Sequence, residues 1–131
     1  MALGAAGIDI TCECTTDLSA KRFYIVILSD DNTVALASTA AETVFGVLQN
    51  KPDGTAGESA VVRILGLSKV TMGESSLAVT ALLSTTAAGT AEQADGAGDF
   101  CVGQLVISAD SGEIGTVFVN PGMGTTHASD A

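Results

Sequence analysis

The side chain best suited to acid–base chemistry in this chain is its single histidine, His127, four residues before the end of the sequence. Any Ser-His-Asp or Cys-His site would need this imidazole as its base. A chain end is a poor place for a base that must hold one position, because terminal residues are usually the least ordered. We therefore expect no catalytic residues and no enzyme activity.

Three cysteines, Cys12, Cys14 and Cys101, are the next candidates for chemistry. Alternate residues of a strand lie ~6.6 Å apart, which is too far for an easy disulfide between Cys12 and Cys14. A zinc site needs a fourth ligand and usually a Cys-x-x-Cys pair, which the sequence lacks. The pattern predicts three buried thiols that act as small hydrophobic groups in a reducing cytosol, with no metal and no cofactor.

Other reaction motifs are missing from the sequence. It contains no phosphate-binding loop, nucleophile elbow, zincin helix or dinucleotide fingerprint. Asp95 and Asp99 flank two glycines in a pattern faintly similar to a calcium loop, but the EF-hand spacing is absent. We interpret this segment as a plain turn, and the Asp30–Asp31 pair as part of a solvated turn.

The charge of the chain excludes further classes of protein. Five Lys and Arg stand against fifteen Asp and Glu, which gives a net charge of −10. Such a chain is repelled by phosphate backbones and by anionic membranes, so we expect neither nucleic acid nor a membrane as partner. Lys21 and Arg22 are adjacent, whereas Lys51, Arg63 and Lys69 lie elsewhere in the sequence, which predicts no nucleic-acid-binding patch.

The elements that would position any site are short strands separated by turn residues. The clearest, 22–29, is apolar on both faces and is typical of a central strand. Residues 38–42 predict a short helical turn, and Gly46 inside a strand predicts a bulge or a close backbone approach. The polar segment 84–99 predicts a long exposed loop with a helical turn near 91–94. Strands are predicted at 22–29, 33–37, 43–48, 60–65, 67–72, 100–108 and 114–119.

This pattern predicts an all-β chain with minor helix, folded as a small β-barrel or sandwich. The first residues differ from the rest. Apolar and polar residues alternate there, and Ile8, Ile10, Cys12 and Cys14 are predicted to share one face. We expect an extended N-terminal arm or edge strand over 1–20, a β-rich domain over 21–122 and a tail over 123–131. The first segment either adds to another subunit's sheet or is the first strand of the chain's own barrel.

Several segments resemble a family of small capsid decoration, or cement, proteins of tailed bacteriophages. They are VALAS at 34–38, FGVLQNKP at 45–52, AGE at 56–58, VRILGLSKV at 62–70 and VFVNPG at 117–122. Members of the family share these pieces in this order. The resemblance is good over 33–72 and loose over 100–122.

The resemblance implies a fold akin to the β-tulip of head-decoration proteins, and no catalysis. It implies a virion protein, made in the host cytoplasm, that binds the outer capsid surface in many copies. Its partners would be the major capsid protein and further copies of itself in a homotrimer. The acidic charge suits the outer face of a DNA-filled shell. The function would be mechanical, because each copy would hold neighbouring capsid subunits together against the pressure of the internal DNA.

Contact residues are assigned here as a hypothesis. The arm would pair with a capsid sheet edge through Ile8, Ile10, Cys12 and Cys14, and removal of residues 1–14 would leave a folded protein. The subunit interface would contain Phe45, Val47 and Leu48. Two other functions stay open, a tail-tube or fibre subunit and a β-structured binding module displayed on the virion. The chain has no Trp and one Tyr, which argues against sugar binding by such a module.

Overall fold

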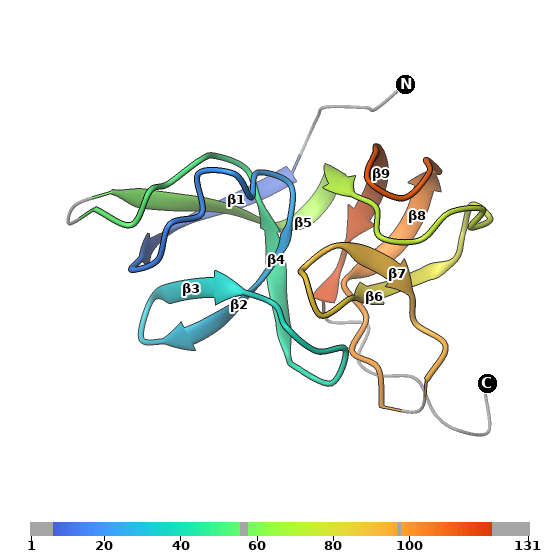
Figure 1. Ribbon diagram of the computed structural model, residues 1–131, viewed down its shortest axis with the longest axis horizontal. Coiled ribbons are helices and arrows are strands. Elements are labelled where there is room, and N and C mark those ends of the chain that lie inside the picture. Colours follow the sequence, from blue (N-terminus) through green and yellow to red (C-terminus); the bar gives the residue numbers. More distant parts are fainter. Residues whose placement is uncertain (1–6, 56–57, 97, 122–131) are drawn as a thin grey trace.

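The computed structural model describes residues 7–55, 58–96 and 98–121, which form nine strands and no α-helix (Figure 1). The strands are β1 (Gly7–Cys14), β2 (Ile25–Asp30), β3 (Thr33–Leu36), β4 (Val44–Leu48), β5 (Ser59–Thr71), β6 (Leu82–Thr85), β7 (Ala91–Gln93), β8 (Gly103–Ile107) and β9 (Ile114–Val119). The described residues include no helix that is long and apolar enough to cross a membrane.

The first five strands close into a small barrel. β1 pairs with β3 and β5, and β2 and β4 complete the ring in the order β1-β3-β2-β4-β5. The closing β1–β3 contact is short and parallel, and it joins Glu13 to Thr33 and Cys14 to Val34. A closed ring leaves fewer unpaired strand edges than an open sheet. The prediction of a small all-β barrel is therefore confirmed.

The remaining strands extend the sheet on the other side of β5, in the order β5-β9-β8-β6-β7. A single parallel bridge between Met72, just after β5, and Ala91 in β7 links the far end of this sheet back to its start. The second half of the chain therefore also curls round its own core, and Figure 1 shows the two halves side by side.

β5 belongs to both halves. Its Ala60 and Val62 lie in a core with β1 and β3 residues, whereas Val70 and the following Met72 lie in a second core with β6, β8 and β9 residues. Gly66 stands between the two stretches with a φ of +109°. An L side chain rarely adopts this backbone conformation, so glycine allows the strand to pass from one half to the other.

β2 and β4 lie between the two cores. Successive residues of β2, Ile25 and Val26, belong to different cores, and so do Val47 and Leu48 of β4. All four are fully buried. This placement explains why 22–29 is apolar on both faces, and it confirms the prediction of a central strand.

The segment 84–99 is not the exposed loop that its composition predicts. β6 and β7 form an antiparallel hairpin, and Ser84, Thr85 and Ala91 are fully buried. The hydroxyls have partners, because Thr85 Oγ1 donates to the carbonyl of Thr86 at 2.9 Å and Ser84 Oγ donates to the carbonyl of Ala40 at 3.5 Å. Small hydroxylated residues can therefore fill a core position at low cost, and composition alone does not reveal this.

The minor helix is also absent from the described residues. Residues 39–42 form one turn, in which Glu42 Oε1 accepts hydrogen bonds from the backbone N–H groups of Ser38 and Thr39 at 2.6 and 2.9 Å. These bonds lower the pKa of Glu42 below its usual value. The contact resembles a helix capping box, but β4 begins at Val44 before a helix can form.

Candidate functional site

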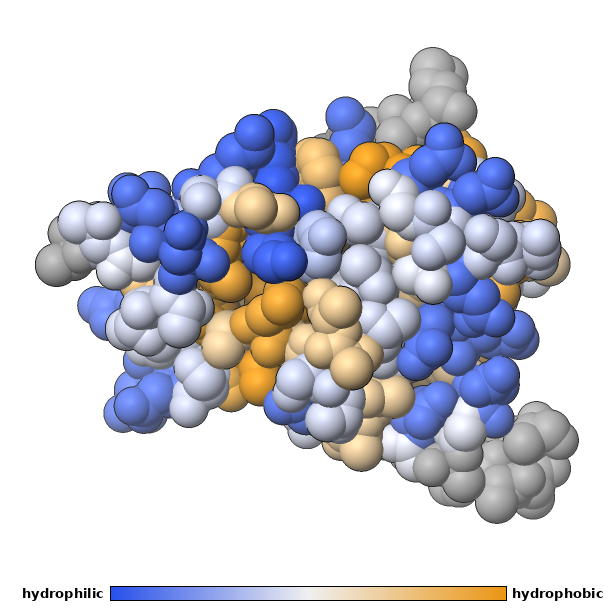
Figure 2. All heavy atoms as spheres, viewed as in Figure 1, coloured by the Kyte–Doolittle hydropathy of each residue, from blue (hydrophilic) through white to orange (hydrophobic). Residues whose placement is uncertain are grey.

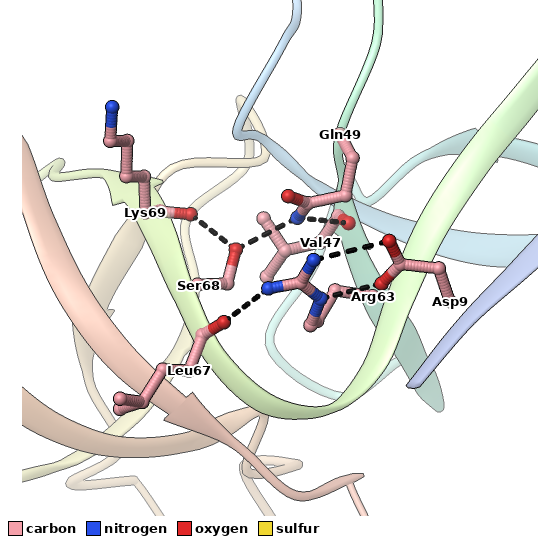
Figure 3. A network of polar contacts seen from close by, with 7 residues as sticks. All are labelled: Asp9, Val47, Gln49, Arg63, Leu67, Ser68 and Lys69. Carbon is pink, nitrogen blue, oxygen red and sulfur yellow. Dashed lines mark hydrogen bonds and ion pairs between the residues drawn. The ribbon is translucent and has the colours of Figure 1, made fainter. Parts of the chain in front are cut away.

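An ion pair joins β1 to β5 within the barrel (Figure 3). Arg63 Nε lies 2.5 Å from Asp9 Oδ1, and its Nη2 lies 3.1 Å from Asp9 Oδ2. The third donor, Nη1, bonds the carbonyl of Leu67 at 2.5 Å, beyond Gly66. The bonds to Asp9 raise the pKa of Arg63 above its usual value. One guanidinium group therefore fixes both β1 and the bend of β5.

A second set of contacts holds β4 against the same bend. Gln49 Nε2 donates to the carbonyl of Val47 at 3.0 Å and to Ser68 Oγ at 2.8 Å. Ser68 Oγ donates to the carbonyl of Lys69, and the serine is only 1% exposed (Figure 3). A buried hydroxyl needs such partners, because an unsatisfied polar group destabilises the fold.

Exposed apolar side chains lie on the outer face beside this junction. Ile8 is opposite Leu65 across β1 and β5, and Leu67 is opposite Phe118 across β5 and β9. Opposite residues share a face of the sheet. Ile8, Leu65 and Phe118 are 53%, 39% and 40% exposed. We call these four residues the outer strip. It is a surface on which a partner could bury apolar area.

Basic side chains meet at a different place, around Phe23 and Tyr24. The Arg22 guanidinium carbon lies 4.6 Å from the centre of the Phe23 ring, and Lys69 Nζ lies 5.6 Å from it. Lys21 Nζ lies 4.8 Å from the centre of the Tyr24 ring. These cation–π contacts hold the basic side chains against the two aromatic rings.

An open pocket of about 360 Å³ adjoins Phe23. Its lining residues are Ser19, Ala20, Arg22, Phe23, Lys51 and Ile114. The structure thus brings Lys51 and Lys69 to Lys21 and Arg22, and we call these four residues the basic cluster. The sequence did not predict this cluster, because only Lys21 and Arg22 are neighbours along the chain. The cluster forms only where these strands and loops meet, so no local sequence pattern predicts it.

Phe23 itself has an unusual backbone. Its φ is +68°, a conformation that costs a bulky residue on the order of 1–3 kcal/mol. Its N–H donates to the carbonyl of Leu48 at 2.7 Å, and its carbonyl accepts from the N–H of Thr71 at 2.8 Å. The ends of β4 and β5 therefore hold the ring where the basic side chains meet.

The fold has a counterpart among phage head proteins. The chain is similar to the head fibre gp8.5 N base of bacteriophage phi29, known from a crystal structure. The TM-score is 0.62 at 21% sequence identity, and the match covers 92% of this chain and 98% of that chain. No protein-family model and no curated protein sequence matches the chain.

The predicted arm residues do not stay on one face. A bulge between Ile8 and Asp9 places Ile8 opposite Leu65 on the outer face, whereas Ile10 is opposite the buried Val62. Ile8 and Ile10 remain exposed, but Cys12 and Cys14 are buried in the barrel core. The strand belongs to the chain's own barrel, the second of the two alternatives.

This position changes one expectation about the N-terminal residues. Removal of 1–14 would take β1 out of the ring and expose the core beneath it, so we no longer expect a folded protein. The predicted tail, 123–131, lies outside the described residues, as does His127.

The residues predicted at a subunit interface lie in the centre of the molecule. Val47 and Leu48 are fully buried in the two cores, and Phe45 packs against the barrel core while part of it stays accessible. Glycine is required at position 46 because β5 approaches closely there, and a Cβ would lie within 2.8 Å of Val62 Cγ1. β2 and β5 flank this strand, so Phe45 is the only one of these three residues that could contact another subunit.

The three cysteines are free and buried, as predicted. Burial raises the pKa of the Cys12 and Cys101 thiols, and the charge of Asp99 adds to the effect at Cys101. In the described part of the chain, no three His, Cys, Asp or Glu side chains gather as a metal site would require. Asp99 Oδ2 accepts the N–H of Gly96 at 2.9 Å, as in a plain turn.

Proposed function

We propose that the protein is a structural component of a phage virion, which binds the outer capsid surface and cements neighbouring major capsid subunits. The observation that carries this proposal is the likeness to a phage head fibre base over almost the whole of both chains. At 21% identity this likeness shows the fold alone, and the virion function is our inference from it. The decoration-protein resemblance of residues 33–72 supports the same function independently.

The surface of the molecule suits this function. Figure 2 shows apolar side chains gathered in the middle of one face, between hydrophilic ends. The outer strip adds exposed apolar side chains beside the ion pair of Asp9 and Arg63. Each Å² of apolar surface buried against a capsid subunit contributes about 25 cal/mol. A homotrimer would present three such surfaces, so modest affinity at each contact would suffice.

Co-sedimentation with undecorated heads of the same phage tests the proposal. We expect saturable binding of the purified protein, and heads that resist heating better once decorated. Light scattering of the unbound protein gives the oligomer, for which we expect a trimer. A wild-type protein that stays in the supernatant at all concentrations would overturn the proposal.

The outer strip offers a variant for the same assay. Phe118→Ser removes an exposed ring, so it should leave the fold intact and weaken head binding. Val79→Ser is the matched control, because Val79 is also exposed but lies in the loop before β6. Equal loss of binding in both variants would argue against the outer strip as the contact.

A second candidate function is the base of a head fibre. It is favoured by the likeness to the phi29 protein, which is itself the N base of a head fibre. Electron microscopy of decorated heads separates the two functions. A cement protein leaves low knobs on the head, whereas a fibre base carries projecting fibres when the whole virion is examined.

A further inference from the structure

We propose that the basic cluster and its pocket bind carboxylate side chains on an acidic surface of the partner protein. This inference rests on the proposed function and identifies the chemistry of one contact with the capsid. It concerns Lys21, Arg22, Lys51 and Lys69, none of which belongs to the outer strip.

The first argument is the distribution of charge. The chain has only five basic residues against fifteen acidic ones, yet four of the five are gathered around Phe23 and Tyr24. The fifth, Arg63, forms the only ion pair found among the described residues. The four therefore have no carboxylate partner within that part of the chain. Several positive charges near one site would together attract a bound carboxylate.

The second argument is the geometry of Arg22. Its guanidinium stacks on the Phe23 ring, and its Nε donates to the carbonyl of Gln49 at 3.1 Å. These two contacts hold the side chain through its Nε and its flat face, and among the described residues its terminal nitrogens make no hydrogen bond. A planar guanidinium positioned in this way is suited to a carboxylate, which it binds through two parallel hydrogen bonds.

The third argument is the mixed character of the pocket. Phe23 and Ile114 form an apolar part, and Ile114 is 42% exposed, while Arg22 and Lys51 supply positive charge. A Glu or Asp side chain has the same division into an aliphatic stem and a charged end. The strained backbone of Phe23, fixed by the ends of β4 and β5, keeps this arrangement in place before a partner arrives.

The net charge of −10 favours a compact group of carboxylates as the ligand of the cluster over a nucleic acid. A nucleic acid extends past the cluster and meets the acidic remainder of the surface, which repels it. Charges more than about 8 Å apart are screened at physiological salt, so a local carboxylate group is attracted by the cluster alone.

Two single substitutions test the contact in the head-binding assay. Arg22→Gln removes the stacked guanidinium and should weaken binding about tenfold. Lys51→Gln should weaken it about threefold, because an exposed lysine contributes less. Both side chains are exposed, so circular dichroism and thermal melting should match those of the wild type.

Asn32→Asp is the matched control, because it changes the net charge by the same single unit. Asn32 is exposed in the turn beyond β2, whose six residues place it about 20 Å from the cluster. Aspartate also tolerates the positive φ of that position. We expect the control to bind heads like the wild type.

Competition identifies the ligand chemistry. Acetylated hexaglutamate should displace the wild-type protein from heads, and sodium hexametaphosphate at equal ionic strength should displace it less. Stronger displacement by the phosphate would overturn the carboxylate assignment. Wild-type binding with no loss in Arg22→Gln and Lys51→Gln would overturn this inference and leave the proposed function standing. Absence of wild-type binding would overturn the proposed function, and this inference with it.

Discussion

Asp9 and Arg63 form a two-point ion pair between residues 54 positions apart in the sequence, at the bulge where β1 meets β5. The same arginine also binds the carbonyl of Leu67 on the far side of Gly66. The Arg63 side chain is 13% exposed and that of Asp9 is 35% exposed, so solvent screens the pair only in part. The pair therefore fixes β1 on β5 within the barrel, and the contact with Leu67 fixes the bend that leads to the second half of the molecule.

We expect Asp9→Ala to lower the free energy of unfolding by about 1–2 kcal/mol, since it leaves Arg63 half-paired. Arg63→Ala should cost more, about 2–3 kcal/mol, because the contact with Leu67 is lost as well. Urea denaturation of both variants and of the double variant measures the coupling. If the two effects simply add, the ion pair contributes nothing of its own.

Gly46 should tolerate no side chain. A Cβ at this position would overlap the carbonyl oxygen of Arg63 and approach Val62 Cγ1 to 2.8 Å. Both lie on the paired strand β5 and cannot move freely. Gly46→Ala should therefore cost more than ~3 kcal/mol or prevent folding. Gly112→Ala is the control, since no atom lies within 4 Å and only its φ of +86° opposes a side chain, at about 1–2 kcal/mol. Equal melting temperatures for the two variants would contradict this account.

Thr80 offers a stabilising substitution. It is exposed, and its φ of +74° is strained for a β-branched residue. Its backbone contacts, to the carbonyl of Leu105 and the side chain of Gln104, do not need the threonine side chain. Thr80→Gly should raise the free energy of unfolding by about 0.5–1 kcal/mol once the entropy of the unfolded glycine is included. Val79→Gly, with an ordinary φ, should lower it, and a parallel fall in both variants would exclude strain as the cause.

The buried thiols make stability depend on alkaline pH. Burial raises the pKa of Cys12 and Cys101 above the ordinary value of 9.0, so the unfolded chain loses these protons first. The stabilisation by neutral thiols is complete below that value and is lost as the pH rises through the folded-state pKa. Urea midpoints at about pH 8 and about pH 10 should therefore fall less in a Cys12→Ala/Cys101→Ala variant than in the wild type. An identical fall in both proteins would show that the two thiols do not cause it.

The sequence by itself determined the strands whose signals are local. Alternating or doubly apolar runs bounded by turn residues located the β2–β3 hairpin, the central strand β2 and the β8–β9 pair. Gly46 was recognised because glycine inside a strand implies a close approach. These features depend on a few neighbouring residues, so they can be recognised without knowledge of the rest of the chain. The hypothesis of a structural virion protein came from the resemblance of residues 33–72 to capsid decoration proteins.

Only the tertiary structure decided which residues meet. The bulge after Ile8 reversed the face of one arm residue, and the pairing with β5 drew Cys12 and Cys14 into the core. The hairpin of β6 and β7 forms although it is rich in small polar residues, because Leu83 and Ala91 join the second core and Ser84 and Thr85 are buried as well. Lys51 and Lys69 reach Phe23 because the loop after β4 and the second half of β5 end beside it. Each of these contacts joins residues far apart in the chain, and their energies depend on burial and distance, which appear only when the strands are placed together.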